Sequence, residues 1–177
     1  YVDYTDDIYV GYRYFETIPG TAEKVVYPFG YGLSYTTFDV ETVSAGVVNS
    51  NCTSEANKLY AKVRVTNTGK FSGKEVVQVY IAKPQGKLGK PAKELAAFEK
   101  TRELQPGESQ LMILTWEIND MASYDDLGKV KKSAYVLEAG SYDTYVGTSV
   151  RDVTKADYSY ILNQDVITEQ LSTKLVP

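Results

Sequence analysis

Two adjacent pairs of aspartates are the side chains whose types and spacing come nearest to a reactive site. They are Asp6-Asp7 and Asp125-Asp126. Paired carboxylates can serve as general acid and general base, or as calcium ligands. Neighbouring residues on a strand point to opposite faces, however, and aspartates in turns cap the backbone or stay solvated. The second pair also lacks the ligand spacing of an EF-hand loop. We therefore expect neither pair to be catalytic or to bind a metal.

Histidine is absent from the 177 residues. Its absence removes the most common general base, every serine–histidine triad and most zinc sites. The single cysteine, Cys52, has no histidine to activate it as a nucleophile. Gly30-Tyr31-Gly32 lacks the third glycine and the following helix of a phosphate-binding loop. The sequence thus predicts no catalytic residue, no cofactor and no metal ligand, so this chain alone is not expected to be an enzyme.

Arg13 and Trp116 are the remaining candidates for a polar or sugar-binding role. Arg13 is surrounded in sequence by aromatic residues, namely Tyr9, Tyr12, Tyr14 and Phe15. An arginine in this setting can stack on a ring or pair with a buried carboxylate. We interpret it as a strut that anchors this strand to the sandwich domain, with a role near a sugar-binding cleft as the alternative. Trp116 lies on an apolar strand face, so we expect it in the core rather than on a sugar platform.

The composition excludes several partners. Hydrophobic residues make up 43% and charged residues 24% of the chain, as in globular proteins with a real core. The net charge of −4 and the lack of a large basic cluster argue against nucleic acid and anionic membranes. No apolar stretch approaches the roughly 20 residues of a membrane span. The 16 tyrosines indicate half-buried sheet surfaces, with a sugar-stacking surface as the alternative.

The single cysteine, Cys52, is the residue that could indicate the cellular compartment. One cysteine excludes an intrachain disulfide, so packing alone must hold the fold together. Asn51-Cys52-Thr53 fits the glycosylation acceptor pattern, which arises often by chance, and we expect it to be unmodified. The localisation is not decided by the sequence, although the cytoplasm is favoured over secretion.

Strand patterns separated by turns cover residues 38–150. Leu59, Ala61, Val63 and Val65 alternate with more polar residues, which is typical of a half-buried strand. A short helical turn is expected at residues 119–124, capped by Asn119 or Asp120. Seven strands are predicted at residues 38–48, 59–66, 76–81, 96–103, 110–118, 134–137 and 142–147. Their number and turn spacing predict an all-β fold, an immunoglobulin or fibronectin type III-like β-sandwich.

The flanking segments differ from this pattern. Residues 8–15 alternate with apolar side chains on both faces and predict one strand that needs a partner sheet. Residues 26–38 crowd aromatic side chains around Pro28, Gly30 and Gly32, which predicts a tight, packed junction. Residues 151–177 lose the strand pattern and predict an extended linker or a short helix.

Two motifs carry a family resemblance. Residues 9–15 read Tyr-Val-Gly-Tyr-Arg-Tyr-Phe, and residues 26–38 read Val-Tyr-Pro-Phe-Gly-Tyr-Gly-Leu-Ser-Tyr-Thr-Thr-Phe. Together they resemble the signature of glycoside hydrolase family 3, the β-glucosidase group. The resemblance spans residues 4–150 and continues, in the same order, through residues 65–69, 73–80, 93–95, 98–100, 104–109 and 138–142.

The resemblance implies a division of the chain. Residues 1–37 would close the α/β sandwich domain of such an enzyme, and residues 38–150 would form its fibronectin type III-like domain. Residues 151–177 would be a linker toward a following domain, which in permuted members is the (β/α)₈ barrel. Retaining glycosidases use two carboxylates about 5–5.5 Å apart. In this family the nucleophilic aspartate lies on the barrel and the acid/base in the sandwich domain, and neither region is in this chain.

The resemblance therefore implies a non-catalytic accessory module of a β-glucosidase-type enzyme that hydrolyses terminal β-D-glucosyl or related residues. Its partners would be the catalytic domains of the same parent enzyme, and the carbohydrate would be a substrate of the parent. We then expect an exposed aromatic patch around residues 8–35, where those domains attach. The alternatives are a carbohydrate-binding module and an oligomerisation module that forms a homodimer.

Overall fold

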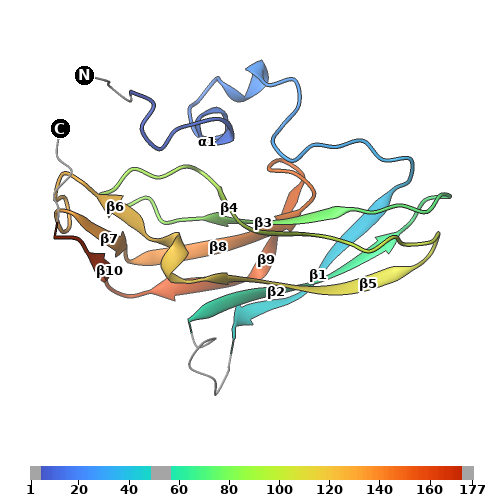
Figure 1. Ribbon diagram of the computed structural model, residues 1–177. Helices are drawn as coiled ribbons and strands as arrows, with labels where there is room; N and C mark the ends of the chain where they lie inside the picture. The colour runs from blue at the N-terminus through green and yellow to red at the C-terminus, as the bar shows by residue number, and fades with distance from the viewer. Residues whose placement is uncertain (1–4, 49–56, 173–177) are drawn as a thin grey trace.

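Strands in three sheets dominate the computed structural model, which describes residues 5–48 and 57–172. The larger sheets have the strand orders β1-β2-β5 and β4-β3-β8-β9, and a small third sheet has the order β10-β7-β6 (Figure 1). The strands are β1 Phe38–Val47, β2 Lys58–Asn67, β3 Val76–Ala82, β4 Glu94–Lys100, β5 Ser109–Glu117, β6 Ser123–Asp125, β7 Ala134–Leu137, β8 Gly140–Gly147, β9 Val153–Leu162 and β10 Val166–Gln170. The predicted β-sandwich is confirmed, and all seven predicted strands are present.

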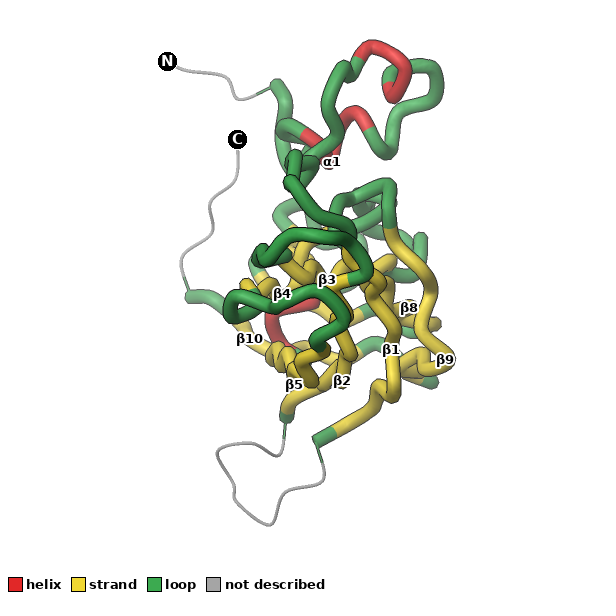
Figure 2. The backbone as a smooth tube through the Cα atoms, turned by 90° about the vertical axis from the view of Figure 1, so that its right-hand side faces the viewer, coloured by secondary structure: helices red, strands yellow, loops and turns green. Residues whose placement is uncertain are grey.

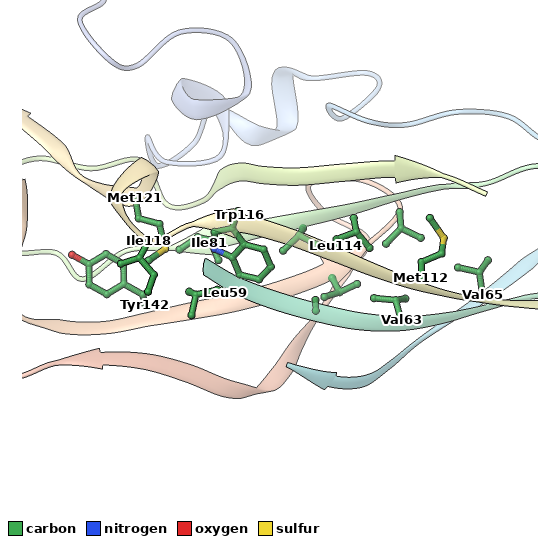
Figure 3. Close-up of a cluster of buried hydrophobic side chains, with 14 of the residues drawn as sticks. Leu59, Val63, Val65, Ile81, Met112, Leu114, Trp116, Ile118, Met121 and Tyr142 are labelled. Carbon is green, nitrogen blue, oxygen red and sulfur yellow. The ribbon is translucent and has the colours of Figure 1, made fainter. Parts of the chain in front are cut away.

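The core lies between the two larger sheets, where alternate side chains meet (Figure 3). Leu59, Val63 and Val65 of β2 are fully buried, as the alternation predicts. Trp116 packs in the same cluster with 5% of its surface exposed, so its core role is confirmed. Each fully buried Leu or Val side chain contributes about 1.5–3 kcal/mol relative to leaving it in water.

The prediction of a linker or helix at residues 151–177 is wrong for the part that the structure describes. β9 pairs with β8, and β10 pairs with β7. The register of β9 shifts between its pairings with Asp143 and Tyr145, so its buried and exposed positions do not keep a period of two. β6 was also not predicted because it has only three residues.

The predicted helical turn after β5 is present as a 3₁₀ turn, Asn119–Met121. The predicted cap is wrong, because the N-cap position belongs to Ile118 and no side chain caps the turn.

Residues 8–15 do not form the predicted strand. They form turns followed by the four-residue helix α1, Tyr12–Phe15, and a 3₁₀ turn follows at Ala22–Lys24. Gly11 has a φ of 59°, which breaks an extended path, and no neighbouring strand offers this segment a ladder of hydrogen bonds. Among residues 5–48 and 57–172, no helix is both long and apolar enough to cross a bilayer.

Residues 5–37, called the aromatic segment below, lie on the β4-β3-β8-β9 sheet. They cover the face that is turned away from the β1-β2-β5 sheet (Figures 1 and 2). This placement explains why β3 is buried on both faces. Val77, Val79 and Ile81 face the core, whereas Gln78 and Tyr80 are buried on the opposite face.

Candidate docking surface

Three aromatic rings join the aromatic segment to the outer face of β3. The ring of Tyr12 stacks on Phe29 with a centroid distance of 4.5 Å, and it meets Tyr80 edge-on at 6.2 Å. The Tyr12 hydroxyl also accepts a hydrogen bond from the backbone N–H of Leu95 at 2.9 Å. Aromatic pairs of these geometries are favourable beyond the area that they bury. The two family motifs, residues 9–15 and 26–38, therefore meet each other on β3.

The side chain of Gln78 links the motif at residues 26–38 to the sandwich. Its amide nitrogen donates to the carbonyl of Thr148 at 2.7 Å and to that of Gly30 at 3.3 Å. Its amide oxygen accepts from the Tyr80 hydroxyl at 2.5 Å. Burial, and then the nearby Tyr12 and Glu16, raise the pKa of Tyr80, which keeps this hydroxyl a donor.

Gly30 is required for this contact, as the sequence predicts for a tight path. It has a φ of 83°, and a Cβ there would lie 2.2 Å from the Gln78 side-chain oxygen. The preceding carbonyl, of Phe29, accepts from the backbone N–H of Val150 at 2.9 Å. Gly32 differs, because its φ is ordinary and a Cβ there would meet nothing within 4 Å. The prediction of a tight path thus holds at Gly30 and is wrong at Gly32.

Ion pairs fix the aromatic segment at two further points. The Arg13 guanidinium lies 3.5 Å from the carboxylate of Glu94, which also pairs with Lys83. Arg151 donates to Glu16 at 2.8 Å and to the carbonyl of Ala22 at 2.8 Å. Arg13 therefore anchors its segment to β4, which confirms the interpretation as a strut.

The aromatic segment also exposes large apolar and aromatic side chains. Leu33 and Tyr35 are 90% and 96% exposed. We call the set the docking face, and its members are Val26, Tyr27, Tyr31, Leu33 and Tyr35. Beside it, a cleft of about 740 Å³ is lined by Pro28, Gly30 and Leu33 together with charged side chains that include Lys74, Lys100 and Arg151. The expected exposed patch around residues 8–35 is therefore present.

A buried ion pair, which the sequence did not reveal, holds the loop between β3 and β4. The ammonium of Lys90 pairs with the carboxylate of Glu138, and the two residues are 2% and 3% exposed. The same carboxylate accepts from the backbone N–H groups of Lys87 at 2.6 Å and Leu88 at 3.1 Å. In the same loop, the backbone N–H of Ala92 donates a hydrogen bond to the Thr17 hydroxyl of the aromatic segment at 2.8 Å. Forty-eight residues separate the pair, so no local pattern predicts it.

One of the four paired aspartates, Asp125, has a structural role. Asp125 is buried, and its carboxylate accepts four backbone N–H groups, from residues 128–131, at 2.7–3.0 Å. Burial raises the pKa of Asp125, but these four hydrogen bonds outweigh burial and lower it below its usual value. Asp126, Asp6 and Asp7 are exposed. Within the described part of the chain, no cluster of three or more acidic or cysteine side chains offers a metal site. Cys52 and Asn51 lie outside the described residues.

The family comparison places the known domain within the sandwich. Residues 75–150 match the model of the fibronectin type III-like domain. This match contains β3, β4 and β8 of the sheet on which the aromatic segment lies.

Relatives extend the similarity over the whole chain. Beta-glucosidase A of Butyrivibrio fibrisolvens is 59% identical over 185 residues, which cover 100% of this chain and 22% of the relative. A beta-glucosidase of Ruminococcus albus is 42% identical, covering 98% of this chain and 17% of the relative. Among solved structures, a beta-glucosidase of Paenibacillus barengoltzii has a TM-score of 0.88 at 48% identity, covering 96% of this chain and 18% of that one. Beta-glucosidase 3B of Thermotoga neapolitana has a TM-score of 0.77 at 39% identity, covering 93% and 21%.

The fold and the surface define a fibronectin type III-like β-sandwich. Its aromatic segment is fixed to the outer face of the β4-β3-β8-β9 sheet. The chain corresponds to the part of glycoside hydrolase family 3 β-glucosidases that contains this domain. It spans about a fifth of the length of the relatives that it matches.

Proposed function

We propose that this chain is a non-catalytic accessory module that braces the catalytic domains of a β-glucosidase-type retaining glycoside hydrolase. The parent enzyme would hydrolyse terminal β-D-glucosyl or related residues. The docking face carries the proposal, because its side chains are apolar and exposed while other residues of the same segment are fixed to the sandwich. A concentration of exposed apolar and aromatic side chains in one segment favours an interaction site.

The proposal assigns residues 1–37 to the edge of the neighbouring α/β domain and residues 38–150 to the brace. The coverage of the relatives supports the existence of a neighbouring domain, since the chain matches only 22% and 17% of the length of two β-glucosidases. We further propose that the chain supplies no catalytic residue. The buried carboxylate of Asp125 supports this, because it accepts four hydrogen bonds from the backbone of its own loop.

The test is a double substitution, Leu33→Ser with Tyr35→Ser, made both in this chain alone and in the enzyme that contains it. Because both side chains are at least 90% exposed here, the melting temperature of the chain alone should not change. In the whole enzyme each buried apolar side chain is worth about 1.5–3 kcal/mol, so the inactivation temperature should fall. The Michaelis constant for an aryl β-glucoside should stay the same.

Ile161→Ser is the matched control, because Ile161 is 66% exposed and lies on β9, away from the docking face. An unchanged inactivation temperature of the Leu33/Tyr35 variant would contradict the proposal. Titration of the chain with cello-oligosaccharides should give no saturable signal. A saturable signal would favour the alternative of a carbohydrate-binding module.

A further inference from the structure

The edge strands of the three sheets differ in how well they are protected from pairing with another strand. Six strands lie at sheet edges in the described part of the chain: β1, β5, β4, β9, β10 and β6. Exposed edges are usually blunted by bulges, charged side chains or short length. The register is interrupted in β1, β4, β9 and β10, each of which also carries charged residues, and β6 has three residues. Five of the six edges are therefore protected.

β5 has less of this protection, although Arg102 lies beside its first residues and β4 of the other sheet lies close to it. β5 pairs with β2 over nine residues without a register shift, and no charged residue occurs before Glu117. Leu111 and Ile113, on its outward face, are 50% and 59% exposed. A long, regular and apolar edge of this kind is a template for another strand.

We propose that β5 pairs with β5 of a second copy of this chain, antiparallel and centred on Ile113. In that register Ile113 lies opposite Ile113 of the second copy, and Leu111 lies opposite Thr115. Directly opposed residues of antiparallel strands have Cβ atoms about 4.5–5.5 Å apart, so the exposed apolar side chains would cover each other. Such a contact is self-complementary, as a twofold axis requires.

The charges at the two ends of β5 fit the same register. Arg102 lies beside the first residues of β5, where its backbone N–H donates to Gln110 at 2.9 Å and its guanidinium pairs with Glu108 at 2.7 Å. At the other end Glu117 is 44% exposed and lies 3.6 Å from Lys58. Antiparallel pairing places Glu117 of one copy opposite Ser109 of the other, and thus near its Arg102. Because Arg102 pairs with Glu108 and Glu117 pairs with Lys58, two cations and two anions meet at each end.

This inference is independent of the proposed function, because β5 and the docking face belong to different parts of the fold. The docking face is carried by the β4-β3-β8-β9 sheet, whereas β5 is the edge of the other large sheet. A single pair of strands covers less than the roughly 1,200–2,000 Å² of a standard stable interface. The dimer should therefore be in reversible equilibrium with the monomer.

Sedimentation velocity of this chain over micromolar to millimolar concentrations tests the proposal. We expect the weight-average mass to rise from 19.7 kDa toward twice that value. Ile113→Lys places two cations opposite each other and should keep the chain monomeric at every concentration. Ile161→Lys is the control, since Ile161 is a similarly exposed isoleucine on the edge strand β9, and it should behave as the unchanged chain. A chain that stays monomeric throughout overturns the proposal.

Two further variants separate this edge from other routes of association. The Leu33→Ser and Tyr35→Ser double variant should still form dimers. Dimers that are lost in this variant but kept in Ile113→Lys overturn the proposal, because they would form through the docking face. In a Cys52→Ser background, Ile113→Cys should form a disulfide-linked dimer on mild oxidation, whereas Ile161→Cys should not.

Discussion

Removing the carboxylate of Glu138 is the sharpest test of how the β3–β4 loop is held. In Glu138→Ala the ammonium of Lys90, which is 2% exposed, would keep only the carbonyl of Leu88 at 3.3 Å. The backbone N–H groups of Lys87 and Leu88 would lose their acceptor as well. Breaking one side of a buried ion pair costs about 3–5 kcal/mol.

The expected loss is large compared with a total stability of about 5–15 kcal/mol for a protein domain. For a chain of this size, 1 kcal/mol corresponds to a shift of about 2–4 °C in melting temperature. Glu138→Ala should therefore lower the melting temperature by about 6–20 °C. Urea unfolding followed by fluorescence measures the free energy directly, because Trp116 is the single tryptophan and lies in the core.

The double variant Lys90→Met with Glu138→Gln is the matched comparison. It removes both charges while the glutamine oxygen can still accept from the loop backbone, so it should recover most of the loss. This follows because the cost of Glu138→Ala arises from an unpaired buried charge. The reasoning is refuted if Glu138→Ala lies within about 1 kcal/mol of the unchanged chain, or if the double variant is as unstable as the single one.

Three further predictions concern single residues. The folded-state pKa of Asp125 lies below its unfolded value of about 3.9, so its stabilising contribution is present above that value and is lost as the pH falls through the folded-state pKa. Urea unfolding should therefore show a smaller loss of stability between pH 6 and pH 3 in Asp125→Asn than in the unchanged chain. A Cβ on Gly147 would lie 1.9 Å from the carbonyl oxygen of Asp152. Gly147→Ala should therefore lower the free energy of unfolding, measured by chemical denaturation, by more than about 2 kcal/mol. Gly32→Ala, where a Cβ meets nothing within 4 Å, should change it by under about 0.5 kcal/mol. Tyr12→Phe removes the acceptor for the Leu95 N–H and should cost about 0.5–1.5 kcal/mol, seen as a lower melting temperature; equal stability would show that water replaces the hydroxyl.

The sandwich was predictable because its core strands obey a local rule. Leu59, Val63 and Val65 are buried at every second position of β2, and Trp116 continues the same alternation on β5. A period of two is visible in the sequence wherever one face of a strand meets the core. β9 was not predicted because its register shift breaks that period.

The docking surface was predictable only in part. The sequence predicted the packed aromatic character of residues 26–38 and the need for glycine at position 30. It did not predict the conformation of residues 8–15. Tyr12 contacts Tyr80 of β3, whereas Ile8, Val10 and Tyr14 of the same alternating set are exposed, so the alternation does not mark a strand. The pair Lys90–Glu138 depends on tertiary approach between distant positions, which no spacing rule reports.

The attachment of the aromatic segment to β3 has a mechanical consequence. β3 is an inner strand, with β4 on one side and β8 on the other, and Gln78 at its centre holds the segment through Gly30. The same segment continues directly into β1, which belongs to the other large sheet. A displacement of the segment would therefore act on both large sheets at once, through Gln78 on one and through the chain itself on the other.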